Sequence, residues 1–466
     1  MKLSVVISCR NAATTLGRAL VSVLEQGFAD MEIVIVDEGS TDGTVALAER
    51  LGERIADFEL ISLAADGGRG AARNAGLARA RGEHVVFLDA EDSYGAGVFA
   101  KVIAELEAFM WADGIEFGVR LADAPPEVLP LQQAVIANSL AGNIILRRAF
   151  VEAIGGFPDD AAFRDGKGDT DSAFRLAVRR WGTVGATSQV ALEHTIQPGG
   201  AFDKFLATSR IVDGRLEMVS DAETQARSAA TSDYLQRVDA AVFRSIGEPA
   251  RHAIRCDMGG RQFDFEIPDR PEMIGEATAA LSNTGYPALP FLGPVQTVLE
   301  VGAGAGAGAV YHACNNPNAR VIALEPTRRG FVLLRRNAFA HANIETYCVG
   351  LYDATTRLDL LDRDGTSHER VLMAQAGAFL SSLRLEHIDI LNMDNRGCEI
   401  AALYALAPYL PKTKSIMVRY YRDMDRRLID AMLTPTHLLY WGRSTQPNQG
   451  QFLYVRRSLL GPDGER

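Results

Sequence analysis

The sequence predicts an α/β protein with two modules, because strand-like apolar runs alternate with helical segments in two separate parts of the chain. In the first part, apolar runs at 3–7, 32–36, 59–63 and 84–88 alternate with helix-like segments, which is typical of a parallel sheet. A second pattern of this kind follows residue 250. No internal repeat relates the two parts, so we expect different modules rather than a duplication.

Three helices are expected between the first four strands, at about 14–26, 42–51 and 70–81. Residues 111–200 are less regular: the prolines at 125, 126 and 130 predict a loop, and 170–181 predicts a helix. Residues 203–250 read as a polar, Ala-rich helical connector. In the second part, 298–301, 320–324, 388–391 and 415–418 predict strands of one sheet.

Composition excludes several classes of protein. With 466 residues, 47% hydrophobic and 23% charged, the chain resembles folded soluble proteins and is long enough for two large domains or three smaller ones. A net charge of −11 argues against a general nucleic-acid binder. The five cysteines are scattered, which gives no zinc pattern and fits a reducing compartment.

The chain contains no apolar run long enough to span a membrane, so we expect a cytoplasmic protein without a transmembrane segment. The segment 411–466 holds 10 basic and 5 acidic residues. A solvated face is the simpler interpretation, and peripheral contact with a membrane surface is the alternative.

Polar residues cluster after three predicted strands, at 8–11, 37–40 and 89–92. Ligands of parallel sheets gather at the carboxyl ends of the strands. There Asp37 could accept the N–H of a nucleotide base, and Asp89 with Glu91 could hold Mg²⁺ or Mn²⁺. Taken singly, each cluster is equally an acidic first turn or a cap of a helix.

Several motifs in order resemble glycosyltransferase family 2. They are EIVIVDEGSTDGT at 32–44, GAARNAG at 70–76, FLDAED at 87–92, IGGF at 154–157 and GDTDSAFR at 168–175. The resemblance implies a GT-A fold, which is Rossmann-like, over residues 3 to about 200. It also implies transfer of a sugar from a nucleotide-sugar donor to a glycan or lipid-linked glycan acceptor, with inversion.

The resemblance implies a role for each matching residue. Asp37 would hold the base, Arg73 would contact the base or phosphates, and Asp89 would help to bind the donor. Asp89 and Glu91 would frame the metal, and Asp169 would be the general base. His194 stands where family members often carry a late histidine.

The chain departs from the family pattern at several positions. Ser8 and Arg10 replace a proline and an aromatic residue, Glu38 and Glu91 replace aspartates, and Gly168 replaces a glutamate.

A glycine-rich turn follows the strand predicted at 298–301 and starts with Gly302 and Gly304. Glu325, 21 residues beyond Gly304, ends the next strand, where a carboxylate can accept ribose hydroxyls. This arrangement is typical of a nucleoside cofactor, either NAD or S-adenosylmethionine. Tight packing of helix on strand without a ligand is the alternative.

The segments VLEVGAGAG at 298–306, VIALEP at 321–326, LRRN at 334–337 and IDILNMDNRGCE at 388–399 resemble FkbM-like methyltransferases. The resemblance implies a Rossmann-like class I methyltransferase domain that binds S-adenosyl-L-methionine through the side chains and turn at Glu300, Gly302, Gly304, Glu325 and Asp394. The chain also departs from this pattern, and the departures lie at Gly304, Asn392, Arg396 and Arg419.

The sequence therefore predicts a GT-A domain over 1–205, a helical connector over 206–249 and a methyltransferase domain over 250–460. We expect an inverting glycosyltransferase of bacterial surface or secreted polysaccharide synthesis, with a fused sugar O-methyltransferase domain. Two alternatives stay open: a methyltransferase-fold scaffold without catalysis, or a methyltransferase with an inactive glycan-binding GT-A domain.

Overall fold

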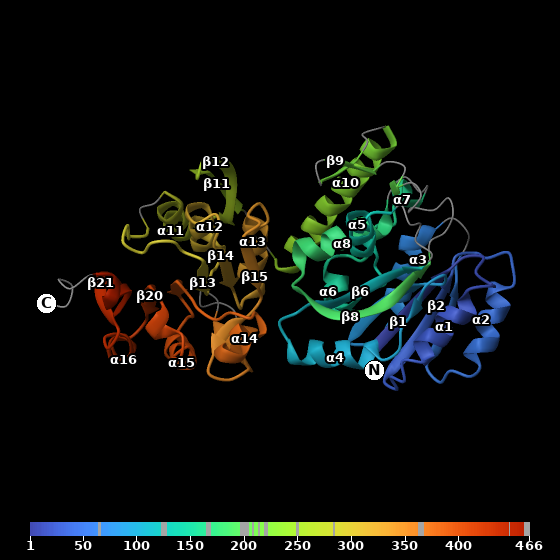
Figure 1. The fold of residues 1–466 in the computed structure, drawn as a ribbon, viewed down its shortest axis with the longest axis horizontal. Coiled ribbons are helices and arrows are strands. Elements are labelled where there is room, and N and C mark those ends of the chain that lie inside the picture. The colour runs from blue at the N-terminus through green and yellow to red at the C-terminus, as the bar shows by residue number, and fades with distance from the viewer. Residues whose placement is uncertain are drawn as a thin grey trace. The chain divides into compact units, whose positions relative to one another are not determined.

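The computed structural model describes residues 1–63, 67–122, 128–164, 169–195, 205–206, 209–212, 215–218, 222–247, 251–282, 285–361, 368–446 and 448–460. The chain divides into two compact units, Met1–Ser245 and Ile246–Arg466 (Figure 1). The domain boundaries expected from the sequence remain a prediction. Helix α10 (Ala222–Ser245), which falls in the expected connector, belongs to the first unit.

The first unit is built on an eight-stranded sheet with the order β3-β2-β1-β4-β7-β6-β8-β5. Its strands are β1 (Leu3–Cys9), β2 (Met31–Asp37), β3 (Phe58–Ser62), β4 (His84–Asp89), β5 (Ser93–Tyr94), β6 (Gly114–Ala122), β7 (Ile144–Arg147) and β8 (Val184–Thr195). The first four are parallel and correspond to the four strands predicted from the apolar runs. This α/β arrangement is the Rossmann-like GT-A fold that the first resemblance implied.

Helices cover this sheet. They are α1 (Leu16–Leu24), α2 (Thr44–Gly52), α3 (Gly68–Arg79), α4 (Val98–Ala108), α5 (Pro130–Ser139), α6 (Arg148–Ala153), α7 (Ala161–Arg164) and α8 (Thr170–Trp181). Helix α3 packs closely on β1 because Gly76 has no side chain. A Cβ atom at this position would come within 2.3 Å of the Val6 side chain. The close approach brings the side chains of α3 to the carboxyl edge of the sheet.

Two expectations for residues 111–250 need correction. Pro130 does not sit in a loop but occupies the first turn of α5, where the missing N–H of proline leaves no hydrogen bond unmade. Residues 125 and 126 lie outside the described residues. Residues 209–212 and 215–218 are not helical: they form the antiparallel pair β9 (Ser209–Val212) and β10 (Arg215–Met218). Sequence patterns over such short strands are weak signals.

The second unit has a seven-stranded sheet with the order β15-β14-β13-β19-β20-β22-β21. Its strands are β13 (Thr297–Val301), β14 (Arg320–Leu324), β15 (Ile344–Tyr347), β19 (Ile390–Met393), β20 (Ser415–Tyr420), β21 (His437–Gln446) and β22 (Gln449–Arg456). The first five are parallel, and β22 runs antiparallel to both of its neighbours. The four strands predicted here are therefore present, with β19 starting two residues later than expected.

Smaller elements surround this sheet. They are the hairpin β11 (Arg251–Met258) and β12 (Arg261–Pro268), the three-stranded sheet β16 (Gly350–Tyr352), β17 (Thr356–Leu361) and β18 (His368–Gln375), and the helices α11 (Pro271–Leu281), α12 (Ala307–Asn315), α13 (Arg328–Ala338), α14 (Ala376–Ser382), α15 (Glu399–Ala405) and α16 (Asp423–Leu433). Helix α12 starts directly after the glycine-rich turn, as the sequence predicts.

Candidate functional site

The three polar clusters of the first unit lie at one edge of its sheet. Cys9 at the end of β1 pairs in register with Asp37 on β2, and Ser8 pairs with Asp89 on β4. Strand ends in register bring residues that are 28 and 81 positions apart into one row. The expectation that these clusters share an edge is confirmed.

Arg73 is the buried centre of this edge. Its side chain is 2% exposed, and Nη2 lies 2.7 Å from Asp89 Oδ1 while Nη1 pairs with Asp171. The guanidinium also lies over the Phe157 ring, 5.0 Å from its centroid. Although burial opposes the charge, the carboxylates of Asp171 and Asp89 raise the pKa of Arg73. Arg73 therefore joins β4 to the first turn of α8.

A cavity of about 1000 Å³ opens over this edge. Its walls come from the strand tips, α3, α5, α7, α8 and α10, and the lining residues include Ser8, Arg10, Glu38, Arg69, Asp89, Glu91, Asp169, Asp171, Ser172, Leu176, Arg227, Ser228, Thr231 and Leu235. Of the residues expected at the site, Asp89, Glu91 and Asp169 line it. Asp37 and Arg73 lie beneath the surface and do not.

Asp37 is buried, and only one of its two carboxylate oxygens has a hydrogen-bond partner among the described residues. Its Oδ2 accepts a hydrogen bond from the backbone N–H of Ser40 at 3.0 Å. Its Oδ1 is buried and has no hydrogen-bond partner among the residues that the structure describes. An acceptor left without a donor is unfavourable in a protein interior, so this oxygen could take an N–H donor from a ligand.

Asp169 caps helix α8. Its carboxylate accepts from the backbone N–H of Ser172 at 3.2 Å and from the Ser172 hydroxyl at 2.5 Å. These bonds orient the side chain at the N-terminus of the helix, where negative charge is favoured. Gly168, which takes the place of the family's glutamate, lies outside the described residues.

Asp89 is compensated by arginines on two sides. Arg69 lies 3.3 Å from its Oδ2, opposite the contact with Arg73, and the Ser8 hydroxyl donates to Oδ1 at 3.3 Å. Burial alone would raise the pKa of Asp89, but Arg69 and Arg73 hold it well below its usual range. Asp89 is therefore ionised.

Unlike that of Asp89, the environment of Glu91 disfavours the charged form of its carboxyl group. Burial and the nearby Asp89 carboxylate raise its pKa, and burial also raises the pKa of Glu38. Extra negative charge at this wall favours a cation, and carboxylate oxygens suit Mg²⁺ or Mn²⁺, so the donor chemistry fits a divalent ion. Within the described residues, however, no group of three or more His, Cys, Asp or Glu is placed to hold a metal by itself.

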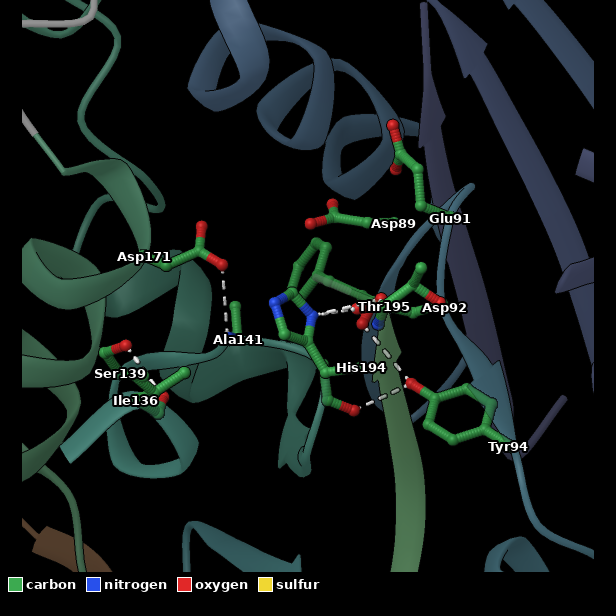
Figure 2. A network of polar contacts seen from close by, with 12 residues as sticks. Asp89, Glu91, Asp92, Tyr94, Ile136, Ser139, Ala141, Asp171, His194 and Thr195 are labelled. Carbon is green, nitrogen blue, oxygen red and sulfur yellow. Dashed lines mark hydrogen bonds and ion pairs between the residues drawn. The ribbon is translucent and has the colours of Figure 1, made fainter. Parts of the chain in front are cut away.

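His194 lies close to this cluster at the end of β8. Figure 2 shows its ring between Asp92 and Asp171, with Asp89 nearby. Nδ1 lies 3.0 Å from Asp92, which also accepts the backbone N–H of Thr195 at 3.0 Å. Although burial opposes it, the contact with Asp92 raises the pKa of His194. The histidine singled out by the resemblance is thus held against the acidic cluster.

Sequence reasoning missed three parts of the site. Arg69 lies one turn before Arg73 on α3, and its spacing of four could have identified it. Asp171 was quoted in a motif but given no role. Helix α10 was read as a connector, yet its residues at 224, 228, 231 and 235 line the cavity, a helical spacing that marks one face.

In the second unit, the glycine-rich turn packs against the end of the neighbouring strand β19. Gly302, Gly304 and Gly306 have φ values of +77°, +57° and +93°. A Cβ atom on Gly302 would lie 1.9 Å from the backbone oxygen of Asp394. Glycine is therefore required at this position by both conformation and space.

The residues expected to hold a cofactor come together around this turn. Two cavities of about 190 and 210 Å³ share Met273, Gly304 and Ala305. Glu300, Gly302 and Asp394 line the first, and Glu325 lines the second.

The carboxylates of this unit are already engaged by the protein. Glu325 accepts from the N–H of Gly304 at 2.8 Å and from that of Thr327 at 3.0 Å. Asp394 accepts from Arg419 at 3.1 Å and from the Tyr421 hydroxyl. These bonds explain the geometry of the turn even without a ligand.

Glu300 is buried beside neutral partners. Its Oε1 accepts from the Asn392 amide at 2.6 Å, and burial raises its pKa to about 7. His312 lies 3.5 Å away, and burial lowers its pKa to about 4. Glu300, which lines the smaller cavity, therefore titrates near neutral pH beside an uncharged imidazole.

One segment of the chain is similar to a known protein family. Residues 4–110 match the family described as glycosyl transferase family 2. This match lies within the first unit. Asp37, Arg73, Asp89 and Glu91 lie inside the matched segment, and Asp169 lies beyond it.

Curated relatives match the same part of the chain. An uncharacterized glycosyltransferase of Nostoc sp. is 43% identical over 113 residues, which is 24% of this chain and 34% of the relative. The succinoglycan biosynthesis protein ExoO of Rhizobium meliloti is 35% identical over 103 residues, which is 22% of this chain and 29% of ExoO. The chain thus spans about a third of the length of the curated relatives it matches.

Among solved structures, residues 1–349 of S. aureus TarS in complex with UDP-GlcNAc are 20% identical to this chain, and the match covers 53% of this chain and 72% of that one, with a TM-score of 0.40. In the parts of the chain that the structure describes, none of the helices has both the length and the apolar character that crossing a membrane requires.

Proposed function

We propose that the first unit is an inverting glycosyltransferase that moves a sugar from a nucleotide-sugar donor to an acceptor hydroxyl in polysaccharide synthesis. One observation carries this proposal. Buried Arg73 joins Asp89 at the tip of β4 to Asp171 at the start of α8. As a result Glu91 and Asp169, 78 residues apart, face one cavity. The names of the curated relatives, ExoO among them, agree with this class of reaction.

The donor would lie along the strand tips. Asp37 would accept an N–H from the base through its Oδ1, which lacks a donor among the described residues. Because Asp37 lies beneath the cavity lining, the base would have to displace the residues that cover it. Arg69 and Arg73 would keep Asp89 ionised beside the diphosphate. Asp89 and Glu91 would hold a divalent ion, with the remaining ligands supplied by the diphosphate. When bound, this ion neutralises charge on the departing diphosphate.

Asp169 would act on the acceptor side. Its carboxylate would take the proton of the acceptor hydroxyl while that oxygen bonds to the anomeric carbon of the donor sugar. The bond from this carbon to the diphosphate breaks, and the nucleoside diphosphate leaves with the electron pair. The hydrogen bonds from Ser172 would fix the direction of the carboxylate before this step.

The test is release of nucleotide from UDP-, GDP- and dTDP-sugars with Mn²⁺. We expect one donor to be consumed, and Asp169→Asn to reduce the turnover at least a hundredfold because proton transfer contributes on the order of 10²–10⁴ to the rate. Asp57→Asn is the control, since Asp57 is exposed and lies outside the cavity. Full activity of Asp169→Asn would remove the base from its role.

The second candidate function concerns the other unit, which we propose binds a nucleoside cofactor of the S-adenosylmethionine class. The sheet order, the glycine turn and Glu325 at the end of β14 support it. Glu325 would accept the ribose hydroxyls, and the cofactor would supply a methyl group when bound. Asp394, which the resemblance also assigns to the cofactor, fits less well because Arg419 and Tyr421 already engage its carboxylate. No transfer step is therefore assigned.

Calorimetry with S-adenosylmethionine tests this binding. We expect heat of binding with the whole chain, its loss in Glu325→Ala, and its retention in Glu272→Gln, which changes an exposed residue outside both cavities. Absence of heat at millimolar cofactor would favour a scaffold without a ligand.

A further inference from the structure

Helices α8 and α10 form one wall of the large cavity. Near their C-terminal ends, α8 and α10 are tied together by the ion pair of Arg180 with Asp239 at 2.6 Å. Trp181 adds a hydrogen bond to Asp239 at 3.0 Å. Residues from the N-terminal parts of both helices line the same cavity.

Both helices contribute residues to the cavity lining. Asp169, Ser172 and Leu176 lie at the start of α8 and along it, Ser228, Thr231 and Leu235 lie on α10, and all six line the cavity. In each helix, the first residues that line the cavity are polar and the last is a leucine.

The leucine end of the wall is unusual for an open surface. Leu176 is 45% exposed although it belongs to a well-packed amphipathic helix, and Leu235 is half-buried. Val135 on α5 lines the same cavity. Large apolar side chains gathered in a cavity mark a binding surface more often than scattered ones do.

The polar end lies next to the proposed base. Along α8, Leu176 lies seven positions after Asp169, which is about 10 Å at the rise of an α-helix. That distance leaves room for a short saccharide between the base and the leucines. Hydroxyl side chains such as Ser228 and Thr231 suit its hydroxyl groups, since each can donate and accept.

We infer that this wall is the acceptor subsite and that the acceptor is amphipathic. Its saccharide hydroxyls lie against the polar residues near Asp169, and its apolar aglycone lies over Leu176, Leu235 and Val135. This inference rests on the proposed function, because it takes Asp169 as the end at which transfer occurs.

The test uses two ligands with one sugar and different aglycones, methyl and octyl β-D-glucoside, with the whole chain below the micelle concentration of the octyl compound. Calorimetry gives the Kd of each. We expect the octyl compound to bind at least tenfold more tightly. Leu176→Asn and Leu235→Asn should each reduce that preference to threefold or less and leave the methyl compound unchanged.

Leu24→Asn is the matched control, because Leu24 is a helix leucine of the same unit, 44% exposed, outside the cavity. It should keep the full preference. Equal binding of the two glucosides, or an unchanged preference in both cavity variants, would overturn the inference.

Donor consumption is measured separately and distinguishes the two proposals. A donor that is consumed without any octyl preference refutes the subsite and leaves the transferase intact. An octyl preference that depends on Leu176, together with no turnover of any donor, supports an amphipathic ligand and refutes sugar transfer.

Discussion

Both units place acidic side chains at or near the carboxyl ends of parallel strands, but the environments of these side chains have opposite effects on their charge. In the first unit, Asp89 lies between Arg69 and Arg73 and is held ionised. In the second, Glu300 is buried with an amide and a neutral imidazole for partners, and its pKa rises to about 7. The first arrangement presents fixed charge to a ligand, whereas the second stores a proton.

The space beside these carboxylates differs as well. The first unit leaves a cavity of about 1000 Å³ over its strand tips, and the second leaves about 190 Å³ beside Glu300. In the second unit, the backbone of the glycine turn fills the room, with Gly302 pressed against Asp394. A large cavity with compensated charge favours a bulky anionic donor, and a small one favours a compact ligand or dense packing.

Removing the guanidinium of Arg73 should destabilise the cluster of charged residues in the first unit. Arg73→Leu leaves Asp89 and Asp171 buried without their shared partner, and loss of one partner of a buried ion pair costs about 3–5 kcal/mol. We expect the first unit to lose stability by this amount, measured by hydrogen exchange in peptides from β4 and α8. The second unit should be unaffected.

Arg79→Leu is the matched control for this change. Arg79 lies on the same helix but is exposed and pairs with Glu59 at the surface, where ion pairs contribute about 1 kcal/mol or less. Equal losses in the two variants would show that Arg73 acts through helix α3 in general and not through its two carboxylates.

A methyl group at the glycine turn should break the second arrangement. Gly302→Ala combines a left-handed backbone, which costs about 1–2 kcal/mol, with a Cβ atom that would lie 1.9 Å from a backbone oxygen. We expect a loss of about 3 kcal/mol in the second unit, measured by hydrogen exchange in peptides from β13 and α12.

Gly293→Ala separates the two causes. Gly293 has φ +64°, but a Cβ atom there would meet nothing within 4 Å. It should therefore cost only about 1 kcal/mol, the conformational part alone. If both alanines cost the same, close packing against Asp394 is not what requires glycine at position 302.

The sequence predicts the strand tips of both units well. Apolar runs located β1, β2, β4, β13 and β14, and the polar residues that follow them fall at one edge because parallel strands end together. Asp89, Glu91 and Asp169 could therefore be named from motifs. The cavity that they share also depends on where α8 and α10 pack. The local sequence pattern does not reveal that packing.

What the sequence could not supply is the pairing between distant segments. Arg69 was recognisable by its spacing from Arg73, but its contact with Asp89 depends on how closely α3 approaches β1 at Gly76. The cavity-lining face of α10 carries serine, threonine and leucine, residues that also suit an exposed helix. Asp394 matched a motif, and only the fold showed it held by Arg419 and Tyr421.

The smallest expected effect concerns the protonation of Glu300, which the comparison with Asp89 depends on. The folded protein raises the pKa of Glu300 from 4.5 to about 7. As pH rises from 4.5 to 7, the unfolded chain releases this proton while the folded chain retains it, so the second unit loses stability over that range. Above pH 7 the loss is complete and constant.

Glu300→Gln removes the titrating group and keeps an oxygen that can accept from Asn392. We expect the variant to be more stable than the parent at pH 8, by about 2 kcal/mol, and the advantage to shrink toward pH 5. Thermal unfolding of both proteins between pH 5 and 8 measures the difference, with exposed Glu272→Gln as the control. If the advantage of Glu300→Gln were the same at every pH, the carboxyl would not be storing a proton, and the contrast with Asp89 would rest on cavity size alone.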